Sequence, residues 1–391
     1  MAKSKAEFDI IVYGASGFTG RLVAEYLAKR GIKRWAMAGR SAAKLAEVRD
    51  LIGAPRDTPL VEADASEPAT LTAMCNRARV IITTVGPYQL YGPELVKACA
   101  ETGTDYVDLC GEPAWMRHMI DAHDATAKKS GARIVFSCGF DSIPFDLGVW
   151  FLEQEAIRRH GKPAPRVKGR VRKMQGGASG GTIASLTETM KAATRDPRII
   201  GLLRSSFALT PGFEGPAQPS GMIPEYDNAT GTWAAPFVMA AINTKNVHRS
   251  NFLLGHPYGK DFTYDEMMMT TIGDAGKAIA EGIATALKSA NPFGEGPQPK
   301  PGEGPSAEQR ENGFYDILFI GEYPDGTSVR ASVNGDRDPG YGSTSKMIAE
   351  SALTLLVHDT PGGIVTPGAI MAEPLIRRLE AHAGLIFKIE S

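Results

Sequence analysis

The chain has 391 residues, of which 43% are hydrophobic and 22% are charged, and its formal net charge is -1 at pH 7. This length suits two domains, each with a sizeable hydrophobic core. A charge so close to zero gives no overall field for nucleic acid or for an anionic membrane, so both are excluded as general partners.

The four cysteines form no Cys-x-x-Cys pair, and no His/Cys cluster has metal-ligand spacing. This pattern predicts reduced thiols, no metal and a cytoplasmic location. The N-terminal stretch MAKSKAEFD is short and polar and lacks the apolar region of a signal peptide. No run of about 18 apolar residues occurs, so no transmembrane segment is predicted.

Residues 9–138 alternate short apolar runs with helical patterns. This rhythm predicts an α/β fold with a Rossmann-type, doubly wound parallel sheet. The first helix is predicted over Gly20–Lys29, with Gly31 as its C-terminal stop. The predicted strands are Asp9–Tyr13, Trp35–Ala38, Pro59–Glu62, Val80–Thr84, Tyr106–Asp108 and Arg133–Phe136.

The first strand leads into GASGFTG, in which Gly14, Gly17 and Gly20 open a helix. In a dinucleotide-binding turn, such glycines permit the tight turn, the approach of the pyrophosphate and the packing of helix on strand. The pyrophosphate would lie on the free N–H groups of the helix N-terminus. A plain turn between strand and helix is the alternative. The other residues predicted to line this site are Ala15, Ser16, Phe18 and Thr19.

The second strand ends in AGRS, which places Gly39, Arg40 and Ser41 over the adenosine ribose, with Lys44 one helical turn later. An acidic residue here binds the ribose 2′-hydroxyl of NAD, whereas an arginine accommodates the 2′-phosphate of NADP. No carboxylate competes in this stretch, so NADP(H) is the predicted cofactor. The alternative is that Arg40 is a solvated surface charge.

The next two strands are expected to end at the same crevice. After the third, Asp64 and Ala65 would contact the adenine, or Asp64 would bond a backbone amide or cap the following helix. The fourth strand ends in TTVGPYQLYG, where Val85, Gly86 and Pro87 would pass close to the nicotinamide ribose.

The rhythm changes after residue 150, which predicts a second, α+β domain. It contains the cationic run RVKGRVRKMQ, the glycine-rich GGASGGT, and a hairpin, FYDILFIGEYPDGTSVRASVNG, with Pro-Asp-Gly as its turn. Further helices are predicted over Ile183–Thr194, Asp274–Ala290, Ser343–Val357 and Glu373–His382.

Four motifs, GASGFTGRLVAEYL, AGRS, VGPYQLYGPELVKACAETGTDYVDLCGE and CGFDSIPFDLG, resemble the saccharopine dehydrogenase-like NADP-binding family. The C-terminal DPGYGSTSKMIAESALTLL and GGIVTPGAIMAEPLIRRLEAHAGLIF are similar to its bacterial trans-acting enoyl reductase branch. The resemblance implies reduction of a carbon–carbon double bond in an acyl substrate, which in some relatives is bound to a carrier protein. It also implies a C-terminal segment that completes or buttresses the Rossmann sheet.

These considerations divide the chain into three parts. Residues 1–150 are expected to bind NADP(H), residues 151–335 to bind substrate and mediate a homodimer, and residues 336–391 to form a helical segment that packs back on the Rossmann domain.

Enoyl reduction needs a hydrogen-bond donor for the developing enolate oxygen and a proton for the α carbon. Tyr88 and Tyr91 flank the loop after the fourth strand, and either hydroxyl is a candidate, with packing as the alternative. Tyr88 is also expected to contact the cofactor. Asp141 and Ser142 follow the sixth strand, where capping or cofactor orientation is the alternative to proton transfer. Glu112 is a further candidate and is expected to be structural.

Two other features have a structural and a functional interpretation. Cys138 lies beside the crevice, but no positioned base accompanies it, so a buried structural thiol is predicted. The stretch GGASGGT would form an anion-binding nest ahead of a helix, or it would simply allow close packing.

Two alternative functions follow from the same sequence. Saccharopine-type imine reduction would need fixed cations, which Arg166, Lys168, Arg170 and Arg172 would supply unless they form a solvated sheet face. The apolar residues of the middle region favour an acyl cleft instead. A non-catalytic NADP(H)-binding scaffold or sensor is the remaining alternative.

Overall fold

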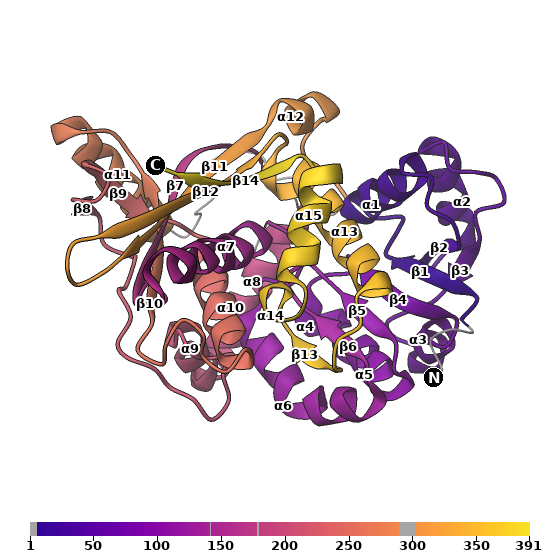
Figure 1. The fold of residues 1–391 in the computed structure, drawn as a ribbon. Coiled ribbons are helices and arrows are strands. Elements are labelled where there is room, and N and C mark those ends of the chain that lie inside the picture. Colours follow the sequence, from indigo (N-terminus) through magenta and orange to yellow (C-terminus); the bar gives the residue numbers. More distant parts are fainter. Residues whose placement is uncertain (1–5, 141, 178–179, 289–301) are drawn as a thin grey trace.

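The computed structural model of this chain describes residues 6–140, 142–177, 180–288 and 302–391. The described residues form two seven-stranded sheets with helices around them (Figure 1). A single cluster of buried apolar side chains includes residues of both sheets, for example Val12 of the first and Phe319 of the second. The two sheets therefore share one continuous core.

The first sheet has the strand order β13-β6-β5-β4-β1-β2-β3, and all of its strands are parallel. Its central strands read as continuous apolar runs because helices cover both faces. This arrangement confirms the predicted Rossmann-type sheet. The strands are β1 Phe8–Tyr13, β2 Trp35–Gly39, β3 Leu60–Glu62, β4 Ala78–Thr83, β5 Asp105–Val107, β6 Arg133–Val135 and β13 Gly363–Val365.

The helices between these strands begin and end where their sequences dictate. Pro113 starts α6 at a position that needs no N–H, and Gly131 ends it with a φ of 83°, which few other residues adopt. The helices of this part are α1 Phe18–Lys29, α2 Ala42–Leu51, α3 Pro68–Cys75, α4 Tyr88–Tyr91, α5 Pro93–Thr102 and α6 Pro113–Ser130.

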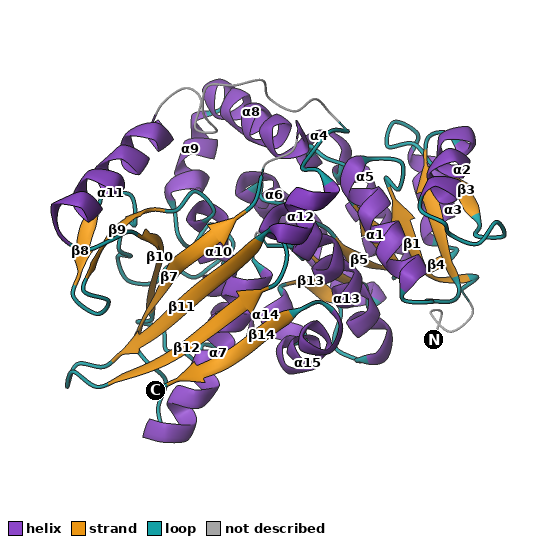
Figure 2. Ribbon diagram, turned by 90° about the horizontal axis from the view of Figure 1, so that it is seen from above, coloured by secondary structure: helices purple, strands orange, loops and turns teal. Residues whose placement is uncertain are grey.

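The second sheet has the order β14-β12-β11-β7-β10-β9-β8, and β7 and β10 form its parallel pair (Figure 2). The predicted hairpin is β11–β12, whose eight paired positions run from Tyr315↔Gly335 to Glu322↔Ser328. Its strands are β7 Arg166–Gln175, β8 Glu225–Asp227, β9 Thr232–Pro236, β10 Thr263–Met269, β11 Phe314–Glu322, β12 Ser328–Gly335 and β14 Leu385–Glu390.

Helix α7 joins the two sheets and packs on β11 and β12. Gly148 permits this contact, because a Cβ there would lie 2.3 Å from the Phe319 ring. The remaining helices are α7 Ile143–His160, α8 Gly180–Arg195, α9 Pro197–Arg204, α10 Ala240–Leu253, α11 Gly273–Lys288, α12 Ala307–Asn312, the π-helical turn η2 Pro339–Ser343, α13 Thr344–Val357, α14 Pro367–Ile370 and α15 Ala372–His382.

The C-terminal segment was expected to be helical, and this expectation is wrong in part, because the segment contributes one strand to each sheet. β13 pairs with β6, and β14 pairs with β12. α13 precedes β13 in the chain and α15 precedes β14, and the two helices pack together between α1 and α7 (Figure 1). Glu350 of α13, which is fully buried, accepts from Tyr26 of α1 at 2.7 Å and from Arg378 of α15 at 2.8 Å.

Glu153 on α7 gives a pH-dependent contribution to stability. One of its carboxylate oxygens accepts from the backbone N–H of Ala164 at 2.9 Å, and the other has no hydrogen-bond partner among the described residues. Burial raises the pKa of Glu153 to about 8. A raised pKa in the folded state means that the stabilising contribution is complete at acid pH and is lost as the pH rises through about 8.

We therefore expect Glu153→Gln to gain stability relative to the wild type between about pH 6 and about pH 9. Urea unfolding at the two pH values measures this difference. If the unfolding free energies of the wild type and of Glu153→Gln changed equally between the two pH values, Glu153 would not be the source of the pH dependence.

Candidate functional site

The glycine turn between β1 and α1 is shaped to hold an anion. Gly14 has a φ of 87°, and a Cβ on Gly20 would lie 2.1 Å from the Gly14 carbonyl oxygen, so neither position accepts a side chain. Gly17 is the N-cap of α1, and no side chain caps the first turn or places an acid in it. The N–H groups of Gly14, Ala15 and Gly17 bond to backbone carbonyls, so the uncapped N–H groups at the start of α1 and the positive end of the helix dipole are what the turn offers to a pyrophosphate, and the turn fits a dinucleotide.

The other residues predicted at this turn surround it in different ways. Ala15 is fully buried and donates its N–H to Ala38 at 3.1 Å, so it contributes shape only. Ser16 is exposed, and Thr19 is half-buried. The half-buried ring of Phe18 lies at the start of α1.

A contact to Phe18 comes from the second half of the chain, which the sequence did not indicate. The guanidinium of Arg310 lies 5.6 Å from the Phe18 ring centroid, and that of Arg21 lies 5.7 Å from it. Arg310 also donates to Pro305 at 2.6 Å, and Gly304 is so close that a Cβ would lie 2.5 Å from the Phe18 ring. Arg310 therefore brings a positive charge to the glycine turn.

The end of β2 presents the predicted adenosine site. Gly39 is buried and Arg40 is exposed, and Arg40 forms no ion pair or hydrogen bond within the described part of the chain. Ser41 caps α2 by accepting from the Lys44 backbone N–H at 3.3 Å, and the Lys44 side chain is exposed. Two cations and a helix N-terminus thus lie at one edge of the sheet, where a phosphate would be stabilised.

The expectation that no carboxylate competes at this edge is corrected by the structure. Glu62, the last residue of β3, accepts from the Ala42 backbone N–H at 3.2 Å. Since β3 pairs with β2, its carboxyl end lies beside that of β2, although the two are far apart in sequence. Glu62 is exposed and would face a phosphate bound at the N-terminus of α2.

Asp64 forms a tight turn rather than the N-cap of α3, which is Glu67. It accepts from the backbone N–H and the hydroxyl of Ser66, and these two bonds are the main reason that the pKa of Asp64 lies below its usual value, with a smaller effect from Arg40. The backbone of Ala65 bonds to the Tyr13 hydroxyl. The structure therefore favours the backbone-amide alternative for Asp64.

The loop after β4 lies at the crevice, but Tyr88 does not point into it. Its hydroxyl accepts from the Leu109 backbone N–H at 3.1 Å and donates to Thr83 at 3.4 Å, and its ring packs on Trp115 at 5.8 Å. The side chain is 6% exposed. The structure argues against the Tyr88 hydroxyl as a proton donor, because it is buried and already paired with backbone groups of Thr83 and Leu109, whereas a contact of Tyr88 with the cofactor stays a prediction.

Residues 85–87 of this loop, which were predicted to border the nicotinamide ribose, lie next to the glycine turn. Val85 contacts the glycine turn, since its Cγ2 would lie 2.7 Å from a Cβ on Gly14. Gly86 is exposed and Pro87 is buried, and Ser185 of α8 lies 3.7 Å from the Cβ position of Gly86. Helix α8 therefore lies beside the loop.

The remaining catalytic candidates differ in their placement. Tyr91 is 45% exposed on α4. Asp141 lies outside the described residues. Ser142 is fully buried at the start of α7 but does not cap it; its hydroxyl instead accepts from the Asn246 side-chain amide at 2.5 Å.

Helix α10 carries polar residues that the sequence pattern did not mark as buried. A helix that is polar all round usually faces solvent, so no periodicity signalled its burial. In the structure α10 packs against α7, α14 and β10. The buried polar residues are Asn243, Lys245, Asn246, His248, Arg249, Ser250 and Asn251.

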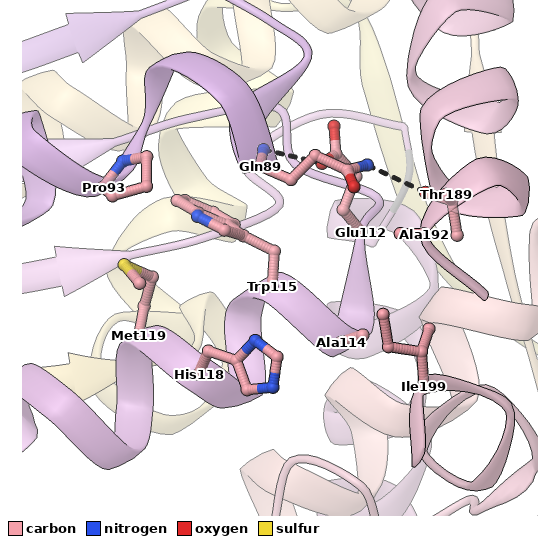
Figure 3. Close-up of a pocket in the computed structure, with 10 residues that line it drawn as sticks. All are labelled: Gln89, Pro93, Glu112, Ala114, Trp115, His118, Met119, Thr189, Ala192 and Ile199. Atoms are coloured by element: carbon pink, nitrogen blue, oxygen red, sulfur yellow. Dashed lines mark hydrogen bonds between the residues drawn. The ribbon is translucent and has the colours of Figure 1, made fainter. Parts of the chain in front are cut away.

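A mostly apolar pocket of about 250 Å³ opens beside the loop after β4 (Figure 3). The carboxylate of Glu112 accepts from the backbone N–H groups of Tyr88 and Gln89, both at 2.9 Å, so Glu112 is structural, as expected. The lining residues are Gln89, Pro93, Glu112, Ala114, Trp115, His118, Met119, Thr189, Ala192 and Ile199.

The cationic strand β7 is neither a solvated face nor a free set of cations. Arg170, which is fully buried, bonds to Asp227 at 2.6 Å and to Asp265 at 2.8 Å. Lys168 pairs with Asp227, Arg166 with Asp265, and Arg172 with Asp316 and Glu390. Carboxylates of β8, β10, β11 and β14 in the same sheet pair with these four cations, so they form no free cationic face for a dicarboxylate substrate.

Two smaller predictions concern Cys138 and the glycine-rich stretch. Cys138 is fully buried, and burial raises the pKa of its thiol, as expected for a structural cysteine. In GGASGGT, a Cβ on Gly176 would lie 2.6 Å from Pro339, and one on Gly177 would lie 3.2 Å from Pro305, which favours close packing. Residues 178–179 of this stretch lie outside the described part.

Within the residues that the structure describes, no group of three or more His, Cys, Asp or Glu side chains is arranged to hold a metal ion. Among the same residues, no helix combines the length and the apolar character that crossing a bilayer requires.

Comparison with known proteins agrees with this geometry. Residues 10–135 match the saccharopine dehydrogenase NADP binding domain. The chain is 38% identical to a trans-acting enoyl reductase of Mycobacterium leprae over 99% of this chain and 98% of that protein, and 39% identical to one of Mycobacterium ulcerans over 97% of each. Its fold is similar to that of apo saccharopine dehydrogenase (L-Glu forming) from Saccharomyces cerevisiae, with a TM-score of 0.51, 13% identity and coverage of 98% and 100%.

Proposed function

Since this chain belongs to the saccharopine dehydrogenase-like NADP-binding family and is an NADP(H)-dependent oxidoreductase, we propose that it reduces the carbon–carbon double bond of an α,β-unsaturated acyl thioester. The observation that carries this proposal is the mostly apolar pocket beside the loop after β4. An apolar lining suits an acyl chain. The full pairing of the β7 cations argues against a dicarboxylate substrate.

The cofactor would be held along the carboxyl edge of the first sheet. The open N-terminus of α1 would bind the pyrophosphate, and Arg40, Ser41 and Lys44 would bind the 2′-phosphate. When bound, NADPH supplies the hydride. Val85, Gly86 and Pro87 would border the nicotinamide ribose, and α8 would limit the access of water to it.

The proton donor stays a proposal. Among the described candidates, Ser142 follows β6 and its hydroxyl is held by the bond from Asn246, whereas Tyr91 follows β4 and is exposed. Tyr91 and Asp141 are tested with it by Tyr91→Phe and Asp141→Asn, which would lower turnover without weakening NADPH binding if either donates a proton.

The experiment that tests the function mixes the purified protein with NADPH and 2-enoyl thioesters of increasing chain length. We expect loss of the nicotinamide absorbance and formation of the saturated thioester, with longer chains preferred because the pocket is apolar. NADPH binding without oxidation by any enoyl thioester would support a scaffold or sensor. Oxidation with α-aminoadipate semialdehyde plus glutamate would support imine reduction instead.

Arg310 gives a separate prediction about the cofactor. Replacing it by alanine is expected to raise the dissociation constants of NADPH and NADH alike, by roughly 10-fold, because it removes a charge near the pyrophosphate that both share. Fluorescence titration of the bound nicotinamide measures both constants. Arg198→Ala on α9, an exposed arginine paired with Asp196, is the matched control and should change neither. A selective loss of NADPH affinity would contradict a role at the pyrophosphate.

Three finer points are also proposals. The acyl chain would be presented on a carrier protein, as in some relatives, and the chain would form a homodimer through residues 151–335. Native mass spectrometry with and without an acylated carrier protein tests both. A cytoplasmic location is supported by four free, buried cysteines, and fractionation of the producing cell tests it.

A further inference from the structure

The pocket beside the loop after β4 is a space between two helical walls. Trp115 of α6 lines one wall, and Ala192 of α8 and Ile199 of α9 line the other (Figure 3). α9 packs on both α6 and α8. The size of the pocket therefore depends on side chains of α8 and α9, which lie outside the Rossmann sheet and its predicted cofactor contacts.

The inner end of the pocket lies near the expected position of the nicotinamide. Ser185 of α8 lies 3.7 Å from the position of a Cβ on Gly86, in the loop predicted to border the nicotinamide ribose. Thr189, one helical turn after Ser185, lines the pocket and accepts from the Gln89 side-chain amide at 3.3 Å. An acyl chain whose double bond faces the nicotinamide would thus extend along α8 toward Ala192.

The outer end of the pocket is open to water. His118, which also lines the pocket, is exposed, and Figure 3 shows it on the other side of Trp115 from Gln89. Carbon atoms that reach beyond His118 would leave the pocket, so they would add little to binding.

The polar groups at the inner end already have protein partners. Both oxygens of Glu112 accept from backbone N–H groups, those of Tyr88 and Gln89, and the hydroxyl of Thr189 donates to the carbonyl oxygen of Ser185 at 2.9 Å. The rest of the lining is mostly apolar, so an acyl chain would bind here by burial of its methylene groups. Each methylene that is fully buried strengthens binding by roughly 4-fold.

The volume of the pocket limits the number of carbon atoms that it can hold. It is about 250 Å³. An apolar cavity of about 150 Å³ in a protein core holds one benzene molecule. By proportion, this pocket holds about 10 carbon atoms of an extended chain.

We propose that this pocket selects acyl substrates of medium length, and that Ala192 and Ile199 are the residues that determine the length. This inference rests on the proposed function. Ala192 leaves space for the chain because its side chain is a single methyl group, and Ile199 narrows the pocket opposite α6.

The experiment measures binding without turnover. Calorimetric titration of the NADP-bound protein uses saturated acyl pantetheine thioesters with even-numbered chains from butanoyl to tetradecanoyl. We expect the dissociation constant to fall by roughly 4-fold or less for each methylene. The fall should stop at about 10 to 12 carbons, where the pocket is full. An affinity that is independent of chain length, or that continues to rise through tetradecanoyl, would overturn the proposal.

Ala192→Phe tests the residue on α8. Its ring would fill most of the space that about six chain carbons use, so the decanoyl thioester should bind at least roughly 10-fold more weakly, whereas the butanoyl thioester should change least. Met190→Phe is the matched control, because Met190 is 58% exposed on the same helix and does not line the pocket. An equal loss of affinity for all chain lengths would contradict a role of Ala192 in length selection.

Ile199→Ala gives a second test, which also serves if Ala192→Phe does not fold. It removes three carbon atoms from the wall, so the longest chain that still gains affinity should become longer by one or two steps of the series. Ile200→Ala is its control, because the neighbouring Ile200 is 38% exposed and does not line the pocket. The same chain-length profile in Ile199→Ala and in the wild type would overturn the role of Ile199.

The same series separates this inference from the proposed function. If the wild type reduces enoyl thioesters but shows no preference for chain length in titration or in kcat/KM, the inference fails and enoyl reduction stands. If no enoyl thioester oxidises NADPH, the proposed function fails, and the titrations alone decide whether the pocket selects acyl chains by length.

Discussion

Replacing Arg40 by alanine is expected to raise the dissociation constant of NADPH by roughly 10- to 100-fold and to leave that of NADH almost unchanged. The two cofactors differ only in the 2′-phosphate, and a charge-assisted hydrogen bond to such a group contributes about 1.5–3 kcal/mol. Arg40 is exposed at the end of β2, where no described side chain forms an ion pair or hydrogen bond with it. Nicotinamide fluorescence titrations with both cofactors measure the effect.

Glu62 supplies the matched control for this result. Its carboxylate accepts from the N-terminus of α2, close to the expected phosphate, so Glu62→Gln should strengthen NADPH binding and leave NADH binding unaffected or weaker. Opposite effects of the two substitutions on the preference for NADPH would place the phosphate between these residues. Equal weakening of both cofactors by Arg40→Ala would count against the assignment.

Asp105→Ala should cause the largest loss of stability, about 3–5 kcal/mol of unfolding free energy, because it leaves a buried guanidinium without its counter-charge. Arg133 is 5% exposed; its backbone N–H donates to one Asp105 oxygen at 2.9 Å, and its guanidinium donates to the other at 3.1 Å. The same guanidinium donates to the carbonyl of Leu355 at the end of α13 at 2.7 Å. Urea unfolding followed by circular dichroism measures the loss.

A double variant separates the charge from the packing. In Asp105→Ala with Arg133→Met, no charge is left unpaired, so the double variant should be more stable than Asp105→Ala alone. If the stability lost by the double variant equalled the sum of the losses of the two single variants, Asp105 and Arg133 would not stabilise the fold through their charges.

The fold of the first sheet was predictable because its signals are local. Each of the six strands reads as an apolar run, and the glycines at positions 14, 17 and 20 mark the turn that follows the first. The pairing of β13 with β6 could not be predicted in this way, since Gly363–Val365 is a three-residue strand far from β6 in the sequence. Short strands that pair over long distances have little sequence signal.

The candidate site was only partly predictable for a related reason. Arg40 and Ser41 follow directly from the position of β2. Sequence alone does not tell whether a tyrosine in a loop faces the ligand or the core, and the hydroxyl of Tyr88 is buried and paired with the backbone. Arg310 reaches Phe18 only through the tertiary fold. The polar helix α10 has a pattern that suggested solvent, so its burial depends on α7, α14 and β10, which pack against it, rather than on its neighbours in sequence.

The last strand has a consequence for how the protein tolerates change at its end. β14 covers the outer edge of β12 over six residue pairs from Gly335↔Leu385 to Arg330↔Glu390. A truncation before residue 385 would uncover a row of unsatisfied amide and carbonyl groups on an eight-residue strand, which is a template for pairing with other molecules. Shortened forms of the protein are thus expected to self-associate into insoluble material while the nucleotide-binding half keeps its own folded sheet.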